Sequence, residues 1–180
     1  MVYHMSNDGR IAVLLPHGVL FRGNNEKKIR EYLIGTLNVV DAIIGLPANL
    51  FHGVSIPTIV MILKKNRNGD SDNIFFMDAS KYFKKGKNMN ELTEEDITRI
   101  VEGYKNRVNV DKFAYKASLS EVKEDNDYNL NIPRYVDTFE EETPINLDDV
   151  RSKIKDAKEQ KQATLDVVNQ MLRELGLKDL

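Results

Sequence analysis

Short apolar runs separated by turn-forming residues fill the first 80 residues and constrain the fold more than any other feature. Each run is rich in aliphatic, β-branched or aromatic side chains, which favours strands over helices at this length. The runs predict strands over residues 11–15, 39–46, 58–64 and 73–78. Continuous apolarity also indicates that both faces of these strands are covered, as in a parallel sheet.

One amphipathic helix is expected between the first two strands. Asn25 resembles an N-cap, a helix begins at Glu26, and Ile29, Leu33 and Leu37 form an apolar stripe. Strand, helix and strand predict a βαβ unit with a parallel pair. The link from strand 39–46 to strand 58–64 is too short for a crossover helix, since it contains two prolines and a glycine. These two strands are therefore expected to form an antiparallel hairpin.

The chain divides into three predicted segments: residues 1–80, 81–146 and 147–180. The middle segment is polar, with a capped helix predicted after Thr93 and an ordered loop over residues 125–146. The last segment predicts a long helix of 28 residues, roughly 40 Å at the usual rise. The expected class is α/β, followed by a mixed segment and this C-terminal helix.

Composition excludes several classes of protein. The net charge is −2, which disfavours a globally basic nucleic-acid binder but leaves room for a local basic patch. The absence of cysteine excludes disulfides, thiolate metal sites and thiol nucleophiles. The three histidines have no metal-type spacing, so no metal site is expected. Neither a membrane span nor a signal peptide is visible, which favours a cytoplasmic protein.

The predicted C-terminal helix carries a heptad stripe, called here the α-seam, with Lys161 and Thr164 at its polar centre. Two interpretations remain open: the stripe packs on its own domain, or it docks onto another chain. The apolar members of the α-seam proposed for contact are Leu147, Val150, Ile154, Val168, Met171 and Leu175.

Familiar catalytic motifs are absent from the chain. No G-x-G, P-loop or G-x-S-x-G occurs. What remains are the loops after the first two strands, which carry Phe21 and Phe51. Ligands of open α/β sheets bind at the carboxyl ends of parallel strands, where both loops are expected. Composition alone favours the simpler interpretation that Phe51 caps the core.

Several ordered segments, however, closely resemble the modification (M) subunit of type I restriction–modification systems. These segments are R-I-A-V-L-L-P-H-G-V-L-F-R-G, V-D-A-I-I-G-L-P-A-N-L-F, I-P-T-I-V-M-I-L-K-K and D-Y-N-L-N-I-P-R-Y-V-D. The resemblance covers nearly the whole chain. It implies an S-adenosylmethionine-dependent N6-adenine DNA methyltransferase with a Rossmann-like sheet. This chain would supply the last three strands of that sheet, including the antiparallel hairpin.

Two motifs of that family are missing here. The methyl-donor motif, typically D-P-A-C-G-S-G, does not occur, and no proline follows an asparagine, so N-P-P-[FY] is absent too. The chain therefore resembles the C-terminal part of an M subunit. No catalytic residue is assigned, and the chain alone is expected to bind no donor and to transfer no methyl group.

The resemblance assigns roles to the target-base side. Phe51 matches an aromatic that stacks on the flipped adenine. The basic side chains are candidates for contacts to DNA phosphates, although each could equally be a solvated surface residue. The candidates are Arg22, Lys64, Lys65, Arg67, Lys81, Lys84, Lys85 and Lys87.

The resemblance also implies partners. A specificity (S) subunit reads the DNA and offers long helices to the α-seam, and a motor (R) subunit joins in the restriction complex. Double-stranded DNA is the substrate, and self-association through the edge of strand 11–15 is a further expectation. The alternatives are a non-catalytic interaction module that binds the S subunit, and a complete enzyme with an unfamiliar site.

Overall fold

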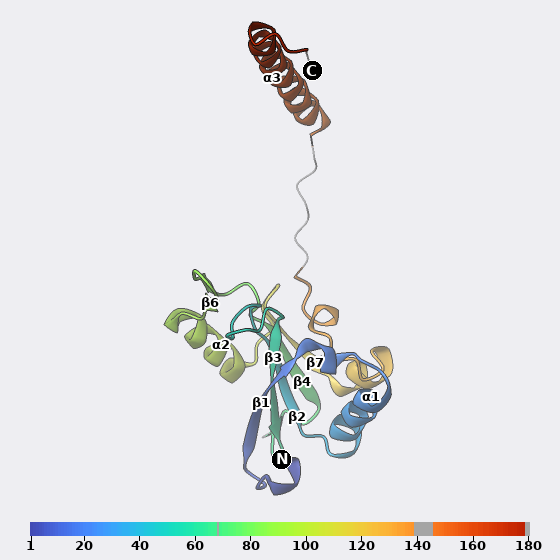
Figure 1. Ribbon diagram of the computed structural model, residues 1–180. Helices are drawn as coiled ribbons and strands as arrows, with labels where there is room; N and C mark the ends of the chain where they lie inside the picture. The colour runs from blue at the N-terminus through green and yellow to red at the C-terminus, as the bar shows by residue number, and fades with distance from the viewer. Residues whose placement is uncertain (68, 139–145, 179–180) are drawn as a thin grey trace. The chain divides into compact units, whose positions relative to one another are not determined.

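The computed structural model describes residues 1–67, 69–138 and 146–178 (Figure 1). It divides into two compact units, Met1–Phe139 and Glu140–Leu180, which are described separately. No helix among the described residues is both long and apolar enough to cross a membrane.

The described part of the first unit forms a mixed five-stranded sheet with the order β1-β3-β2-β4-β7. β3 is antiparallel to β1 and to β2, β4 is parallel to β2, and β7 is antiparallel to β4. β1, β2 and β4 therefore run in the same direction. The strands are β1 (Arg10–Pro16), β2 (Val40–Gly45), β3 (Thr58–Lys64), β4 (Asn73–Asp78) and β7 (Ala114–Ser118).

All four strands expected from the sequence are present, and the antiparallel pairing of β2 with β3 is confirmed. The prediction that strands 11–15 and 39–46 form an adjacent parallel pair was wrong. β3 lies between β1 and β2. The two strands of the βαβ unit therefore run in the same direction but form no hydrogen bonds with each other. Local periodicity identifies a strand but carries no information about its neighbour, which explains the error.

Both faces of the central strands are covered, whereas β1 is half-buried on one face and exposed on the other, so the expected cover on both faces of strand 11–15 was wrong. Every residue of β2 is buried. On one face Ile43 and Phe76 pack with Leu33 and Ile34, which directly follow α1 (Asn24–Glu31), and with the chain after β7. On the other face Ile44 and Phe75 pack with α2 (Glu94–Asn106). Figure 1 shows α1 and α2 on opposite sides of the strands. Burial on both faces explains why β2 is continuously apolar apart from one residue.

The helix between β1 and β2 differs from the expected stripe. α1 passes into a π-helical turn, η3 (Tyr32–Thr36), and Ile34 is fully buried. Ile29 is 56% exposed. The buried residue one step further along α1 is Arg30, whose guanidinium donates to the carbonyls of Val19, Arg22 and Tyr128. The apolar periodicity of the sequence could not identify the buried side of α1, because the residue that anchors this side, Arg30, is polar.

The middle segment contains more strand than expected. Besides β7, it forms a small hairpin of β5 (Lys84–Lys85) and β6 (Asn90–Glu91). α2 begins with the predicted cap, because Thr93 and Asp96 bond reciprocally. The shorter helical turns are η1 (Val2–His4), η2 (His17–Leu20), η4 (Glu121–Asp125) and η5 (Ile132–Arg134).

The loop expected over residues 125–146 is ordered where it is described. Leu130, Ile132 and Val136 are buried, and the ring of Tyr135 stacks on Phe76 with centroids 3.8 Å apart. The Tyr135 hydroxyl donates to the carbonyl of Asn129 at 2.6 Å. These contacts tie the segment to the sheet. Residues 139–145 of the expected loop lie outside the described residues.

The described part of the second unit is one helix, α3 (Leu147–Glu174), of 28 residues. Asn146 caps it by accepting a hydrogen bond from the Asp148 amide at 3.0 Å. The expected long helix is thus confirmed. None of its residues is buried.

Candidate nucleic-acid interface

The co-directional strands β1, β2 and β4 end at the same edge of the sheet, where ligands of such sheets bind. Their last residues are Pro16, Gly45 and Asp78. The loops after them bring together the predicted aromatic, a histidine and a basic hairpin. We call this the carboxyl edge.

The loop between β2 and β3 holds Phe51 at the rim of this edge. The Leu46 amide donates to the Thr58 carbonyl at 2.9 Å and closes the base of the loop. At the tip, the Val54 amide donates to the Phe51 carbonyl at 3.0 Å, with Gly53 in a left-handed conformation. The Phe51 ring is 36% exposed. Phe51 belongs to neither buried hydrophobic cluster, so part of its side chain is open to water at this rim.

The β5–β6 hairpin is bound to the same loop by three hydrogen bonds. The Asn90 amide and side chain donate to the carbonyls of Asn49 and Ala48, both at 2.8 Å. The Asn49 side chain donates back to the Asn88 carbonyl at 3.2 Å. These bonds fix the hairpin beside the Phe51 loop, although the two are about 40 residues apart in sequence.

A surface hollow of about 420 Å³ lies between the Phe51 loop and the hairpin. An aromatic ring, two asparagine amides and a serine hydroxyl line it. These groups can stack on a planar ring and bond its polar edge. The lining residues are Asn49, Phe51, His52, Gly53, Val54, Ser55, Asn88 and Met89.

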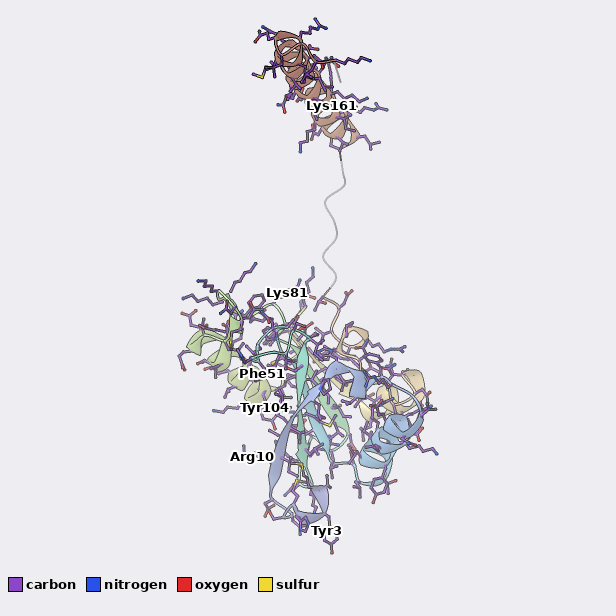
Figure 2. The ribbon with its side chains drawn as sticks, in the orientation of Figure 1. Tyr3, Arg10, Phe51, Lys81, Tyr104 and Lys161 are labelled. Carbon is purple, nitrogen blue, oxygen red and sulfur yellow. The ribbon has the colours of Figure 1, made fainter. Side chains whose placement is uncertain are left out.

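Four of the predicted basic residues lie on or just before the hairpin. Lys84, Lys85 and Lys87 are exposed, as is Lys81. No acidic residue occurs from position 79 to position 90. Figure 2 shows Lys81 and Phe51 toward one end of the sheet and Arg10 and Tyr3 toward the other. The hairpin also carries Glu91, opposite Lys84 in the β5–β6 ladder, and its three lysines still leave it with a net positive charge on a chain of net negative charge.

The other predicted basic residues do not join this patch. Arg67 is 5% exposed, and its guanidinium donates to the carbonyls of Val40, Asn73 and Ser71. Its burial keeps Arg67 from reaching a phosphate, so the prediction for Arg67 was wrong. The carbonyls bind its terminal nitrogens, whereas its buried Nε has no hydrogen-bond partner among the described residues. A guanidinium held inside the fold in this way looks like a surface residue in sequence. Lys65 donates to the Met5 carbonyl, and Arg22 pairs with Glu26 at 3.7 Å.

Lys64 is engaged in a buried cluster at the far end of β3. The carboxylate of Asp41, 1% exposed, lies 3.1 Å from Lys64 and 3.2 Å from Arg107, and accepts from the Tyr104 hydroxyl at 2.6 Å. Burial lowers the pKa of Lys64, but the hydrogen bonds to Tyr104 and Asp41 outweigh it, so the pKa is raised. No sequence signal predicts this cluster, which ties α2 and β3 to the start of β2.

His17 lies at the carboxyl edge, directly after β1, and the sequence assigned it no role. Among the described residues, neither its Nε2 nor the Oγ1 of Thr58 has a hydrogen-bond partner, although both atoms are buried. Burial lowers the pKa of His17, against opposing contributions from Asp78 and the Thr58 carbonyl. The imidazole is therefore neutral at pH 7.

The carboxyl edge does not fit an S-adenosylmethionine site. A donor loop needs glycines where the backbone approaches the ligand. Gly18, in the turn after β1, faces Arg22 instead: a Cβ there would lie 2.7 Å from the guanidinium carbon. The Asp78 carboxylate is occupied by the Ser80 amide at 2.8 Å. Among the described residues, no cluster of His, Asp or Glu could hold a metal ion.

Comparison with known proteins gives the chain's family. The family model for N-6 DNA methylases matches residues 1–144. The MjaVII type I restriction enzyme methylase subunit of Methanocaldococcus jannaschii is 37% identical over 163 residues, 88% of this chain and 28% of the relative. The MpnII methylase subunit of Mycoplasma pneumoniae is 34% identical over 169 residues, 86% of this chain and 31% of the relative.

Solved structures agree. The type I restriction–modification methyltransferase subunit of Streptococcus thermophilus superposes with a TM-score of 0.70 and 53% identity, over 75% of this chain and 28% of that one. This chain therefore spans less than a third of the length of these relatives. The match to the family model covers well over half of the chain. The chain belongs to the N-6 DNA methylase family and is related to the modification subunits of type I restriction–modification systems.

Proposed function

We propose that this chain supplies the target-base side and a subunit-contact helix of a type I modification subunit, which methylates adenine N6 in DNA. The observation that carries this is the pairing of a half-exposed aromatic with a basic hairpin across one hollow. Family membership supports it. The mixed sheet, with antiparallel β3 between β1 and β2, is proposed as the C-terminal part of a Rossmann-like methyltransferase sheet.

The target base must leave the helix before its amino group can react. In the proposed complex, the flipped adenine stacks on Phe51 in the hollow, a contact worth about 1–3 kcal/mol. Asn49 and Asn88 line the same hollow and offer donors and acceptors to the edge of the base. This chain holds the base; it moves no proton and no methyl group.

The hairpin lysines contact phosphates in this proposal. Each neutralised phosphate releases counterions, so affinity falls with salt at a slope of about 0.9 per contact on duplex DNA. Such contacts position the DNA without reading its sequence. The recognised sequence is left to the S subunit, and the R subunit joins for restriction. S-adenosylmethionine binds to parts of the enzyme other than the described carboxyl edge, and the complex is cytoplasmic.

Fluorescence anisotropy with labelled duplex DNA over a range of salt concentrations tests the hairpin. Replacing Lys84, Lys85 and Lys87 with alanine should lower affinity and reduce the salt slope by about 2.7, at about 0.9 per lysine. The matched control replaces Lys153, Lys155 and Lys158 of α3, which removes the same charge. Equal slopes for the two triple variants would mean that the hairpin makes no phosphate contacts and that the proposal is wrong.

A further inference from the structure

The hollow beside Phe51 is built from two segments that the hydrophobic core does not hold. One wall is the tip of the β2–β3 loop, residues 49 and 51–55, and the other is Asn88 and Met89 of the β5–β6 hairpin. None of the residues that line the hollow belongs to either buried hydrophobic cluster. The shape of the hollow therefore depends on the hydrogen bonds that join the loop to the hairpin.

Asn49 and Asn90 make this join and are called here the asparagine clasp. Asn49 has a φ of 55°, in the left-handed region, which asparagine adopts more readily than most residues. Its carbonyl accepts from the Asn90 amide at 2.8 Å, and its side chain donates to the Asn88 carbonyl at 3.2 Å. The Asn90 side chain donates to the Ala48 carbonyl at 2.8 Å. The clasp thus binds the loop both to the turn of the hairpin and to its second strand.

Asn90 also lies within the element that carries the lysines. In the β5–β6 ladder it is opposite Lys85. The turn between the two strands is tight, because the Gly86 amide donates to the Met89 carbonyl at 3.1 Å and a Cβ at Gly86 would lie 2.3 Å from that oxygen. A hairpin closed in this way moves as one body. Its lysines and its wall of the hollow therefore change position together.

The base of the hairpin has anchors that do not involve the clasp. Before β5, the ring of Tyr82 packs edge-on against Phe113 with centroids 5.2 Å apart. After β6, Thr93 and Asp96 form the cap of α2. Loss of the Asn90 side chain should therefore leave the hairpin folded, but less firmly held beside the Phe51 loop.

We propose that Asn90 is a positioning residue, which holds the lysine hairpin against the Phe51 loop so that phosphate contacts and base stacking act on the DNA together. This inference rests on the target-base site proposed above. With the clasp in place, the two walls of the hollow are ordered before DNA arrives. Without the Asn90 side chain, binding of a base must also bring the walls together, whereas the lysines still contact phosphates.

Fluorescence anisotropy of the full chain with two labelled duplexes tests the proposal. One duplex carries a single unpaired adenine and the other an abasic nucleotide at the same place, so the two differ only in the base. The unaltered chain should bind the adenine duplex about 5- to 150-fold more tightly, the range expected for one stacked base. Asn90→Ala should reduce this ratio by about 2- to 12-fold, the effect of one lost hydrogen bond. The salt slope with the abasic duplex should stay the same, because the lysines are unchanged.

Two further variants separate positioning from loss of structure. Asn90→Val keeps a side chain that favours a strand, and it should reduce the ratio as Asn90→Ala does. Asn126→Ala also removes a bond from an asparagine side chain to a backbone carbonyl, at 3.2 Å, but Asn126 does not line the hollow. This control should keep the ratio of the unaltered chain.

An unchanged ratio in both Asn90 variants would overturn the positioning role. A ratio and a salt slope that fall together would overturn it as well, since Asn90 would then only maintain the fold of the hairpin. Phe51→Ala distinguishes these failures from failure of the proposed function. If Phe51→Ala keeps the ratio, or if the unaltered chain binds both duplexes equally, the hollow binds no base and both proposals are wrong.

Discussion

Replacing Asp41 with asparagine should destabilise the first unit far more than its change of one atom suggests. The carboxylate is 1% exposed and neutralises Lys64 at 3.1 Å and Arg107 at 3.2 Å. Removing one partner of a buried ion pair costs about 3–5 kcal/mol, because the remaining charge stays away from water. Arg107 keeps Asp70 at 3.1 Å, so the lower end of that range, about 3 kcal/mol, is expected.

Urea unfolding followed by near-ultraviolet circular dichroism measures this cost. All seven tyrosines precede residue 139 and none lies in α3, so the signal reports on the first unit alone. The matched control is Asp127→Asn, which breaks an ion pair with Lys27 at 2.5 Å on the surface. An exposed pair contributes about 0.2–1 kcal/mol, so this variant should change little.

The Asp41→Asn variant combined with Lys64→Met should recover part of the loss, because it removes one unpaired cation together with the lost acid. If Asp41→Asn and Asp127→Asn lowered the free energy of unfolding equally, the buried carboxylate would not hold the cluster. The reasoning from burial and ion pairing would then be refuted.

Three further predictions concern His17, the unpaired side of strand β1 and the missing methyl-donor motifs. The pKa of His17 is lowered in the folded state, so the contribution of His17 to stability is fully present above its unfolded pKa of about 6.5 and is lost as the pH falls below it; His17→Asn should therefore reduce the fall in stability in acid unfolding curves. Among the described residues, β1 pairs only with β3, so sedimentation over a hundredfold concentration range should show self-association; a strict monomer with fast amide exchange at Val13 would contradict it. Calorimetric titration of the chain with S-adenosylmethionine should give no micromolar binding, and a saturable isotherm in that range would contradict the expected absence of a donor site.

The sequence predicted those elements whose signal is local. Apolar runs bounded by turn residues identified four strands, and Thr93 with Asp96 identified the start of α2, because each signal lies within a few residues. β7 was missed because Ala114–Ser118 holds only small, aromatic and charged residues in a strand that gains its identity from pairing with β4.

Contacts between distant segments could not be predicted in this way. The pairing of β1 with β3, and the bonds from Asn90 to the Phe51 loop, join residues about 40 or more positions apart. Buried polar anchors were missed for another reason. Arg30 and Arg67 look like surface cations in composition, whereas each guanidinium donates to backbone carbonyls inside the fold. The sequence therefore named Phe51 and the hairpin lysines as candidates, but it could not predict the hydrogen bonds that hold the hairpin beside the Phe51 loop.

The role of Phe51 is tested most directly by single-turnover methylation in a complete modification subunit that carries this segment. Phe51→Ala should slow methyl transfer by about 5- to 150-fold, the equivalent of about 1–3 kcal/mol of stacking. Affinity for S-adenosylmethionine should stay unchanged, and Phe51→Tyr should retain most of the rate. Normal turnover per folded molecule in Phe51→Ala, with only reduced stability, would show that the ring belongs to the core and would contradict the proposed target-base site.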